Sequence, residues 1–309
     1  MSAVGVPVGL DPTPATRALR SLAAVLGSSR PLSWVNTAFP FGAAYLLVGG
    51  GLDVAFWVGV LFFLVPYNVA MYGINDVFDH ESDLRNPRKG GAEGVVLDRA
   101  DHRTTLWAAA LTSAPFLAGL LLLGGPTSAL VLAVSVGAVV AYSAPGLRFK
   151  EQPFLDSITS STHFVSPAVL GLVLAADRGA TVAWDGAVTA YLVAFFLWGM
   201  GSHAFGAVQD VRADREGGLA SVGTVLGARA TVWFALHCYL AAAVALVMLP
   251  GRDSWSALLV LPYVLNLVPH LAVTDAACET ANAGWRRFLV LNFVTGFVVT
   301  QWMLVTALV

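Results

Sequence analysis

The chain of 309 residues is 57% hydrophobic and only 12% charged, with a formal net charge of −2. A soluble domain carries roughly twice that share of charged residues, so the composition excludes an ordinary water-soluble enzyme. No basic patch accompanies the near-neutral charge, and we therefore expect no nucleic-acid partner. Both cysteines lie in apolar stretches without metal-ligand spacing and are interpreted as packing residues.

Apolar runs near 20 residues, long enough to cross a bilayer of roughly 30 Å, recur along the chain. Residues 1–30 hold several prolines and arginines and are interpreted as an N-terminal tail with a short surface helix; residues 31–309 then form one polytopic domain. Glycine and proline mark several breaks between runs. The predicted fold is an all-α membrane protein, a bundle of nine transmembrane helices with eight as the alternative count. The predicted spans are residues 32–51, 54–74, 104–124, 127–144, 153–176, 185–205, 228–249, 255–275 and 287–308.

The distribution of cations gives an independent test of this topology. With nine spans, the tail and the loops after spans two, four, six and eight share one side, which receives 15 of the 17 Lys and Arg residues. Only Arg178 and Arg252 fall on the other side. Positive loops remain in the cytoplasm, so we expect a multi-pass cell-membrane protein whose cation-rich loops, including those after spans two and six, face the cytoplasm.

The long connection at about residues 75–103 carries seven acids and five bases in a chain that is otherwise apolar. Asn75, Asp79 and Asp83 are spaced by four, so on a helix they share one face. Asp76 lies about 100° away, at the edge of that face. Such a row of oxygen ligands favours a cation site over an ordinary solvated loop.

A second acidic pair, Asp210 and Asp214, has the same spacing of four and lies on the same predicted side of the membrane. Alone this pair is weak evidence, because such carboxylate pairs occur by chance on many surfaces. Mg²⁺ is usually bound through a few carboxylates together with substrate phosphates. Because Arg88 and Lys89 follow the first row, the two rows together indicate a magnesium–diphosphate site.

Arg148 and Lys150, before the fifth predicted span, can pair with diphosphate oxygens. The alternative is that they are only orienting charges of a cytoplasmic loop. His163 and His203 lie in or near helices, where a buried structural histidine is the more common outcome. Asp156, near the start of the fifth span, is a candidate for supporting the site.

Two acidic motifs between membrane helices resemble those of the UbiA superfamily of intramembrane prenyltransferases. They read Asn75-Asp76-x-x-Asp79-x-x-x-Asp83 and Asp210-x-x-x-Asp214. Two further stretches also match the family pattern: Tyr142-Ser143-Ala144-Pro145 with Arg148 and Lys150, and Gly218, Ser221, Thr224 and Gly227. The resemblance covers about residues 30–309. It implies a helical bundle around a central cavity under a cap of loops and short helices, Mg²⁺, a prenyl diphosphate donor and a lipophilic acceptor.

Within the superfamily, the blocks at residues 72–79 and 202–210 look most like the lycopene elongases. That branch implies transfer of C5 units from dimethylallyl diphosphate to the ends of lycopene, giving C50 carotenoids. Carried over residue by residue, the resemblance gives three sets. The metal ligands are Asn75, Asp79, Asp83, Asp210 and Asp214, with Glu216 as an alternative acid. The catalytic candidates are Asp76, Asp79 and Asp210, and the diphosphate partners are Arg88, Lys89, Arg148 and Lys150.

Two alternatives remain open. The same chemistry can serve another lipophilic acceptor, such as a quinone, chlorophyll or polyprenyl phosphate precursor, and Asn36 and Thr37 are polar groups that suit a phenol. A transporter would instead place ionisable residues near helix midpoints or repeat one half of the chain inverted. The carboxylates here cluster in two loops on one side, which favours the enzyme.

Overall fold

The computed structural model describes residues 13–84 and 96–308, and every regular element within them is a helix. Labels with α mark α-helices and labels with η mark short 3₁₀ helices. In chain order the elements are α1 (Pro14–Ser28), η1 (Pro31–Ser33), α2 (Val35–Leu47), α3 (Val54–Leu64), α4 (Pro66–Phe78), α5 (His80–Asp83), α6 (Arg99–Leu123), α7 (Pro126–Ser143), η2 (Phe149–Glu151), α8 (Leu155–Asp177), α9 (Gly186–Val208), α10 (Val211–Glu216), α11 (Val222–Leu226), α12 (Ala228–Val247), η3 (Gly251–Val260), α13 (Leu261–Leu267), η4 (Val268–His270), η5 (Asp275–Ala281) and α14 (Asn282–Leu308).

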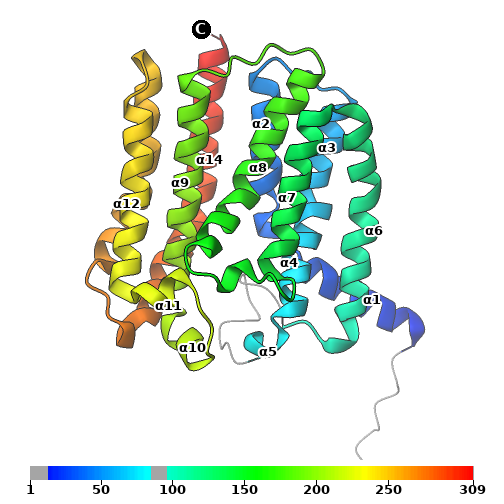
Figure 1. Ribbon diagram of the computed structural model, residues 1–309, viewed down its shortest axis with the longest axis vertical. Helices are drawn as coiled ribbons and strands as arrows, with labels where there is room; N and C mark the ends of the chain where they lie inside the picture. Colours follow the sequence, from blue (N-terminus) through cyan, green and yellow to red (C-terminus); the bar gives the residue numbers. More distant parts are fainter. Residues whose placement is uncertain (1–12, 85–95, 309) are drawn as a thin grey trace, which may run out of the picture.

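The long helices run side by side as a bundle (Figure 1). Six segments in the described ranges are long and apolar enough to cross a bilayer: α3 joined with α4, α6, α7, α8, α9 and α12. They agree with six of the spans that the sequence predicts. The other three predicted spans coincide with α2, with the chain from η3 to η4, and with α14. The count of nine stays a prediction.

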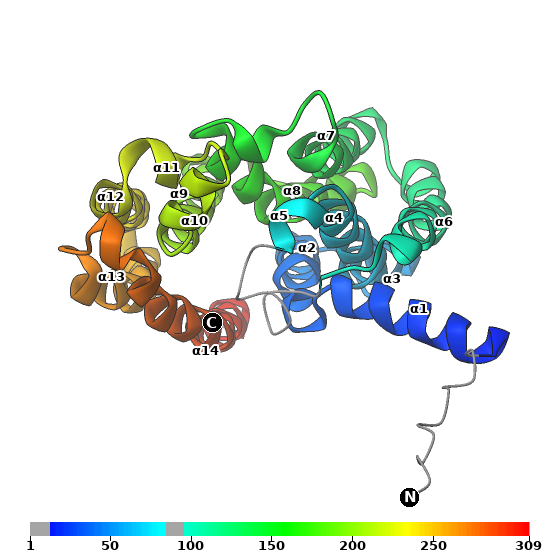
Figure 2. The same cartoon turned by 90° about the horizontal axis from the view of Figure 1, so that it is seen from below.

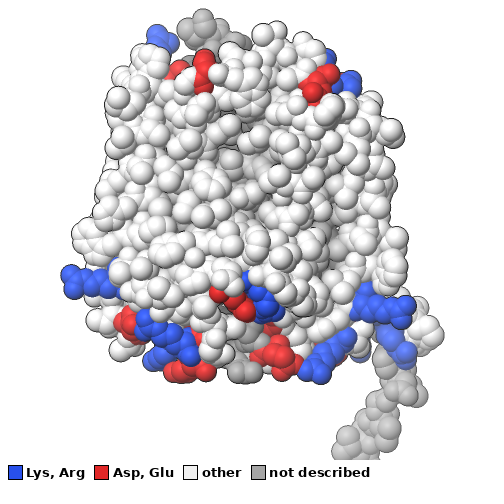
Figure 3. Space-filling model, in the orientation of Figure 1, with Lys and Arg blue, Asp and Glu red and all other residues white. Residues whose placement is uncertain are grey.

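The surface of the bundle matches a membrane environment. Charged side chains gather at its two ends and leave an uncharged belt between them on the face that Figure 3 shows. On α6, Leu111 is 66% exposed and Leu122 is 86% exposed. Such exposure is costly in water and favourable against lipid tails.

At one end of the bundle a single carboxylate joins three helices. Asp53 caps the N-terminus of α3, accepting a hydrogen bond from the Phe56 backbone N–H at 3.0 Å. It also accepts from the Tyr45 hydroxyl of α2 at 3.0 Å and from Arg178 Nε, at the end of α8, at 2.8 Å. The end of the bundle away from the acidic motifs is therefore held by its own polar cluster.

Buried apolar side chains form two main cores. One lies among α2, α3, α4, α6, α7 and α8, and the other among α9 to α14. The halves meet where α8 packs on α9: the Ser161 hydroxyl donates to the Phe196 carbonyl at 2.7 Å, and a Cβ on Gly199 would lie 2.4 Å from Ser161 Oγ. Small residues that let helix backbones approach closely are typical of membrane bundles.

The short helices α5, α10 and α11 gather at one end, which is called the motif end below (Figure 2). Helix α5 follows the end of α4 and belongs to the first half of the chain, whereas α10 and α11 follow α9 and belong to the second. The fold therefore brings the two acidic motifs, far apart in sequence, to the same end of the bundle.

Candidate active site

The first acidic motif keeps a continuous helical path although α4 ends at Phe78. The Asp79 backbone N–H donates to the Asn75 carbonyl at 2.9 Å, and the Asp83 N–H donates to the Asp79 carbonyl at 2.8 Å. These i to i−4 bonds preserve the helical spacing through the break between α4 and α5. Asn75, Asp79 and Asp83 thus follow one face of the chain, as their spacing predicts.

The loop between α7 and α8 approaches this motif closely. Ser143, the last residue of α7, donates from Oγ to Asn75 Oδ1 at 2.9 Å. Asp79 forms an ion pair with Lys150 through Oδ1, and the same oxygen lies 3.7 Å from Arg148 Nη2. The structure thus brings together two predicted diphosphate partners and a predicted metal ligand. The other two, Arg88 and Lys89, lie outside the described residues.

Arg148 is held in an unusual backbone conformation. Its φ of 42° lies in the left-handed region, which costs an arginine about 1 kcal/mol or more. The side chain forms an ion pair with Glu151, which follows three residues later. This tight turn fixes the direction of the segment that carries Lys150.

Lys150 connects the two acidic motifs. Its side chain is only 11% exposed, and burial lowers its pKa to about 8, while the nearby carboxylates of Glu151, Asp76 and Asp214 act in the opposite direction. Asp214 belongs to the second motif, so the ammonium group of Lys150 lies in the field of both. A buried cation between two acidic turns is suited to binding an anion. Metal ions held by the two turns would contact the same anion.

The second acidic motif repeats the geometry of the first. The Asp214 backbone N–H donates to the Asp210 carbonyl at 2.8 Å, so both carboxylates start from one helical turn at the beginning of α10. The side of α10 away from these acids is anchored. Arg215 forms an ion pair with Asp275 and donates to the Thr224 carbonyl, while Asp275 accepts from the Ala228 N–H at 2.7 Å.

Asp76 has a different environment from its neighbours in the motif. It is fully buried, accepts a hydrogen bond from Ser28 Oγ at 2.9 Å and lies 3.3 Å from Arg30 Nη2. Arg30 has a left-handed φ of 53°, and its guanidinium lies over the Tyr72 ring, 4.4 Å from the centroid. These contacts attach the end of α1 to α4.

Sequence reasoning missed Ser28, Arg30 and Ser143 as partners of the first motif. Ser28 and Arg30 precede Asp76 by 48 and 46 residues, and Ser143 follows Asn75 by 68. No local spacing connects residues at such separations. The packing of α1 and α7 against α4 creates these contacts, and the signal in the sequence was limited to the family resemblance of the stretch that contains Ser143.

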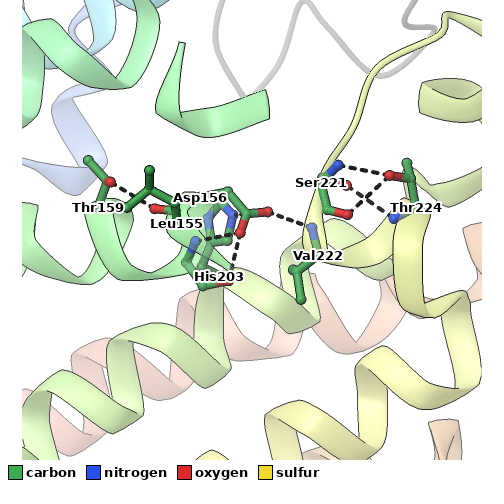
Figure 4. A network of polar contacts seen from close by, with 8 residues as sticks. Leu155, Asp156, Thr159, His203, Ser221, Val222 and Thr224 are labelled. Carbon is green, nitrogen blue, oxygen red and sulfur yellow. Dashed lines mark hydrogen bonds and ion pairs between the residues drawn. The ribbon is translucent and has the colours of Figure 1, made fainter. Parts of the chain in front are cut away.

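A second polar network lies at the motif end, where α8, α9 and α11 meet (Figure 4). Asp156, in the first turn of α8, is fully buried and accepts from the Ser157 N–H at 2.7 Å and from the Val222 N–H at 2.8 Å. His203 Nε2, on α9, lies 3.5 Å from Asp156 Oδ2. Val222 begins α11, whose N-terminus is closed by a capping box between Ser221 and Thr224.

The donor groups of the two motifs fit Mg²⁺. They are an amide oxygen and carboxylate oxygens, the hard ligands that this ion takes. Residues 13–84 and 96–308 contain no ready cluster of three or more His, Cys, Asp or Glu side chains placed to hold a metal ion. Magnesium seldom needs such a cage, because substrate phosphates and water complete its shell. The ammonium of Lys150 already occupies a cation position beside Asp79.

A hollow of about 580 Å³ lies between α10, α11 and α12, outside both motifs. Arg215, Arg229, Trp233 and His237 are among the residues that line it, and no predicted metal ligand does. We therefore place the candidate site at the two acidic turns rather than in this hollow.

Comparison with known proteins agrees with the sequence and the fold. A sequence model of the UbiA prenyltransferase family matches residues 20–304. A Dietzia protein named as a C50 β-cyclic carotenoid biosynthesis protein is 59% identical over 289 residues, 93% of this chain, and this chain spans 66% of its length. A lycopene elongase/hydratase of Corynebacterium glutamicum is 52% identical over 276 residues, covering 89% of this chain and 94% of the relative.

The fold is also that of solved family structures. A UbiA homologue from Archaeoglobus fulgidus, bound to DMAPP and Mg²⁺, superposes with a TM-score of 0.65 at 19% identity. The match covers 89% of this chain and 99% of the Archaeoglobus chain. With a family match along nearly the whole sequence and relatives that are more than half identical to it over the aligned residues, this chain belongs to the UbiA prenyltransferase family.

Proposed function

We propose that the protein transfers a C5 prenyl group from dimethylallyl diphosphate to the ends of lycopene, as a step in the synthesis of C50 carotenoids. The position of Lys150 between the two acidic turns carries the prenyl-transfer part of this proposal. The acceptor rests on the relatives, since the near full-length Corynebacterium relative is a lycopene elongase/hydratase. The Archaeoglobus neighbour, bound to DMAPP and Mg²⁺, supports the donor and the metal.

In this proposal the two acidic turns divide the binding of the diphosphate. Asn75, Asp79 and Asp83 of the first motif and Asp210 and Asp214 of the second would hold Mg²⁺. When bound, the ion neutralises the charge that grows on the leaving diphosphate.

The basic groups act on the same leaving group. Lys150 and Arg148 lie beside Asp79, within reach of an anion bound there, and donate hydrogen bonds to its oxygens. Arg88 and Lys89 are assigned the same role from the sequence. Asp76, although on the sequence motif, binds Ser28 and Arg30 and is assigned to positioning α4 rather than to the metal.

The chemistry follows from the charges. As the C–O bond of the donor breaks, its electron pair leaves with the diphosphate and an allylic cation remains. The terminal double bond of lycopene attacks this cation, a C–C bond forms, and a tertiary cation on the acceptor then loses a proton or captures water. The apolar bundle protects both cations, because free water would quench them.

We also propose the membrane arrangement that this chemistry requires. Nine helices span the cell membrane, with α2, the η3–η4 segment and α14 added to the six segments described above. The motif end faces the cytoplasm, which agrees with the cation asymmetry of the sequence. Short helices and loops there cap a central cavity open to the lipid for the long acceptor.

A membrane assay tests this function. Membranes that contain the protein, given lycopene, dimethylallyl diphosphate and Mg²⁺, should form products one and two C5 units heavier. Membranes with Asp79→Ala provide the matched control. Prenylation of a quinone or chlorophyll precursor, with lycopene left unchanged, would contradict the acceptor but not the family chemistry.

A further inference from the structure

The polar network of Asp156 and His203 has no role in the function described so far. Its position is notable because α8 belongs to the first half of the bundle and α9 to the second. Asp156 is fully buried, whereas the His203 side chain keeps 19% of its surface exposed. A buried carboxylate is costly unless it is hydrogen bonded, and a partly open histidine beside one is a common arrangement for moving protons.

The pair orients the imidazole. His203 Nε2 faces Asp156 Oδ2 at 3.5 Å, which favours the tautomer with the ring proton on Nε2. Nδ1 is then the nitrogen with the free lone pair, and it makes no hydrogen bond to any described residue. The N–H groups of Ser157 and Val222 and the N-terminus of α8 stabilise the carboxylate. A proton taken up at Nδ1 would be balanced by this carboxylate.

The position of His203 along α9, relative to the diphosphate site, also suits a base for the acceptor cation. It lies on α9, which ends at Val208, and precedes Asp210 by seven residues, so it starts nearly two helical turns before the second motif. The axial separation is roughly 10 Å. The donor diphosphate binds at the level of Asp210, and the new C–C bond forms at the donor carbon that carried the diphosphate. The tertiary cation then lies on the acceptor, beyond this bond and away from the diphosphate, and His203 lies on that side, toward the membrane interior.

One aromatic ring, that of Tyr142, lies next to the pair. The Tyr142 ring lies edge-on to both histidines, with centroid distances of 6.4 Å to His203 and 5.3 Å to His163. Tyr142 directly precedes Ser143, which binds Asn75 of the first motif. An aromatic face close to a cation stabilises it, so the same cluster that offers a base also suits a carbocation.

On these grounds, and resting on the proposed function, we propose that His203 is the catalytic base that accepts the last proton of the transfer, with Asp156 as its positioning residue. If the tertiary cation loses a proton, the C–H electron pair becomes the new double bond and the proton binds His203 Nδ1. If water is captured, its oxygen forms the C–O bond and its proton goes to the same nitrogen. The proton then leaves to bulk water before the next turnover.

His163 provides the matched control. It is buried next to the same Tyr142 ring, and its ring hydrogen bonds to the Ala138 carbonyl. His163 Nε2 has no hydrogen-bond partner among the described residues, and none of their carboxylates pairs with the ring. A proton taken up there would be an uncompensated buried charge, which is costly. His163 therefore lacks the feature that the proposal requires.

The test separates ionisation of the donor from completion of the product. Donor labelled with ¹⁸O at the bridging oxygen is incubated with membranes and lycopene, and exchange of the label into the non-bridging positions reports reversible C–O cleavage. His203→Gln and Asp156→Asn should lower elongated carotenoid by roughly 100-fold while label exchange continues. Asp156→Asn keeps one oxygen for the Val222 N–H, but its amide nitrogen cannot accept from the Ser157 N–H, so His203→Gln is the variant that leaves this backbone network intact. His163→Gln should leave product formation close to wild type.

Several results would overturn the proposal. Product and label exchange that fall together in both variants indicate a structural role, and product that stays unchanged in His203→Gln shows that another group, such as the diphosphate, takes the proton. Loss of product in His163→Gln alone would assign the base to that residue. If the wild-type protein fails to elongate lycopene in this assay, the proposed function is refuted. That result is distinct from those that refute only the role of His203.

Discussion

The burial of Asp76 gives a quantitative prediction. Its carboxylate binds Ser28 Oγ at 2.9 Å and lies 3.3 Å from Arg30 Nη2, and it is fully buried. Removing one partner of a buried ion pair costs about 3–5 kcal/mol. Without Asp76, the Arg30 side chain keeps 22% of its surface exposed and keeps its contact with the Tyr72 ring, so part of its charge stays solvated. The lower end of this energy range therefore applies. Asp76→Ala should lower the free energy of unfolding by about 3 kcal/mol.

Thermal unfolding in detergent measures this loss. About 3 kcal/mol corresponds to roughly 6–12 °C in unfolding temperature for a domain of this order of size. Ser28→Ala removes one hydrogen bond to the same carboxylate and should cost about 1–2 kcal/mol. An unchanged unfolding temperature in Asp76→Ala, together with lost activity, would refute the anchoring role and make Asp76 a member of the reacting site.

Three further predictions concern the two motifs and the residues that support them. Asp79→Ala and Asp210→Ala should each lower turnover by roughly 100-fold or more, measured in membranes as elongated product per unit of folded protein, because each removes charge from the leaving-group site. Lys150→Met should raise the KM for the donor by roughly 10–100-fold, whereas Lys150→Arg should restore much of the affinity, which a titration of the diphosphate checks. Asp275 has a pKa held below its usual value by the Ala228 N–H and then by Arg215, so its stabilisation is present above about pH 4 and lost as the pH falls through the folded-state pKa. Asp275→Ala should therefore unfold at a lower temperature than wild type at pH 7, and unfolding scans should show this difference shrinking in acid.

Much of the fold could be predicted because the membrane imposes a simple rule. An apolar run near 20 residues must be a helix, since a lipid environment leaves no water for the backbone groups. Six predicted spans agree with the structure within a few residues; for example, residues 127–144 were expected and α7 is Pro126–Ser143. The shorter helix α2 and the 3₁₀ geometry from Gly251 could not be predicted from hydrophobicity. The length of an apolar run does not show where a helix ends or where it changes from α to 3₁₀ geometry.

The candidate site was predictable where its residues are local. Spacing alone placed Asn75, Asp79 and Asp83 on one face, because helical periodicity is a property of the chain itself. The burial of Asp76 and the pairing of Asp156 with His203 depend on which helices pack together. These contacts join residues more than 40 positions apart, so no single-sequence pattern contains them.

The most direct measurement is the mass of the pigments in a lycopene-producing host that expresses this protein. Our account predicts new carotenoids one and two C5 units heavier than lycopene, and their absence when the host expresses Asp79→Ala or Asp210→Ala. A host in which the folded wild-type protein accumulates in the membrane but lycopene remains unchanged would contradict the account.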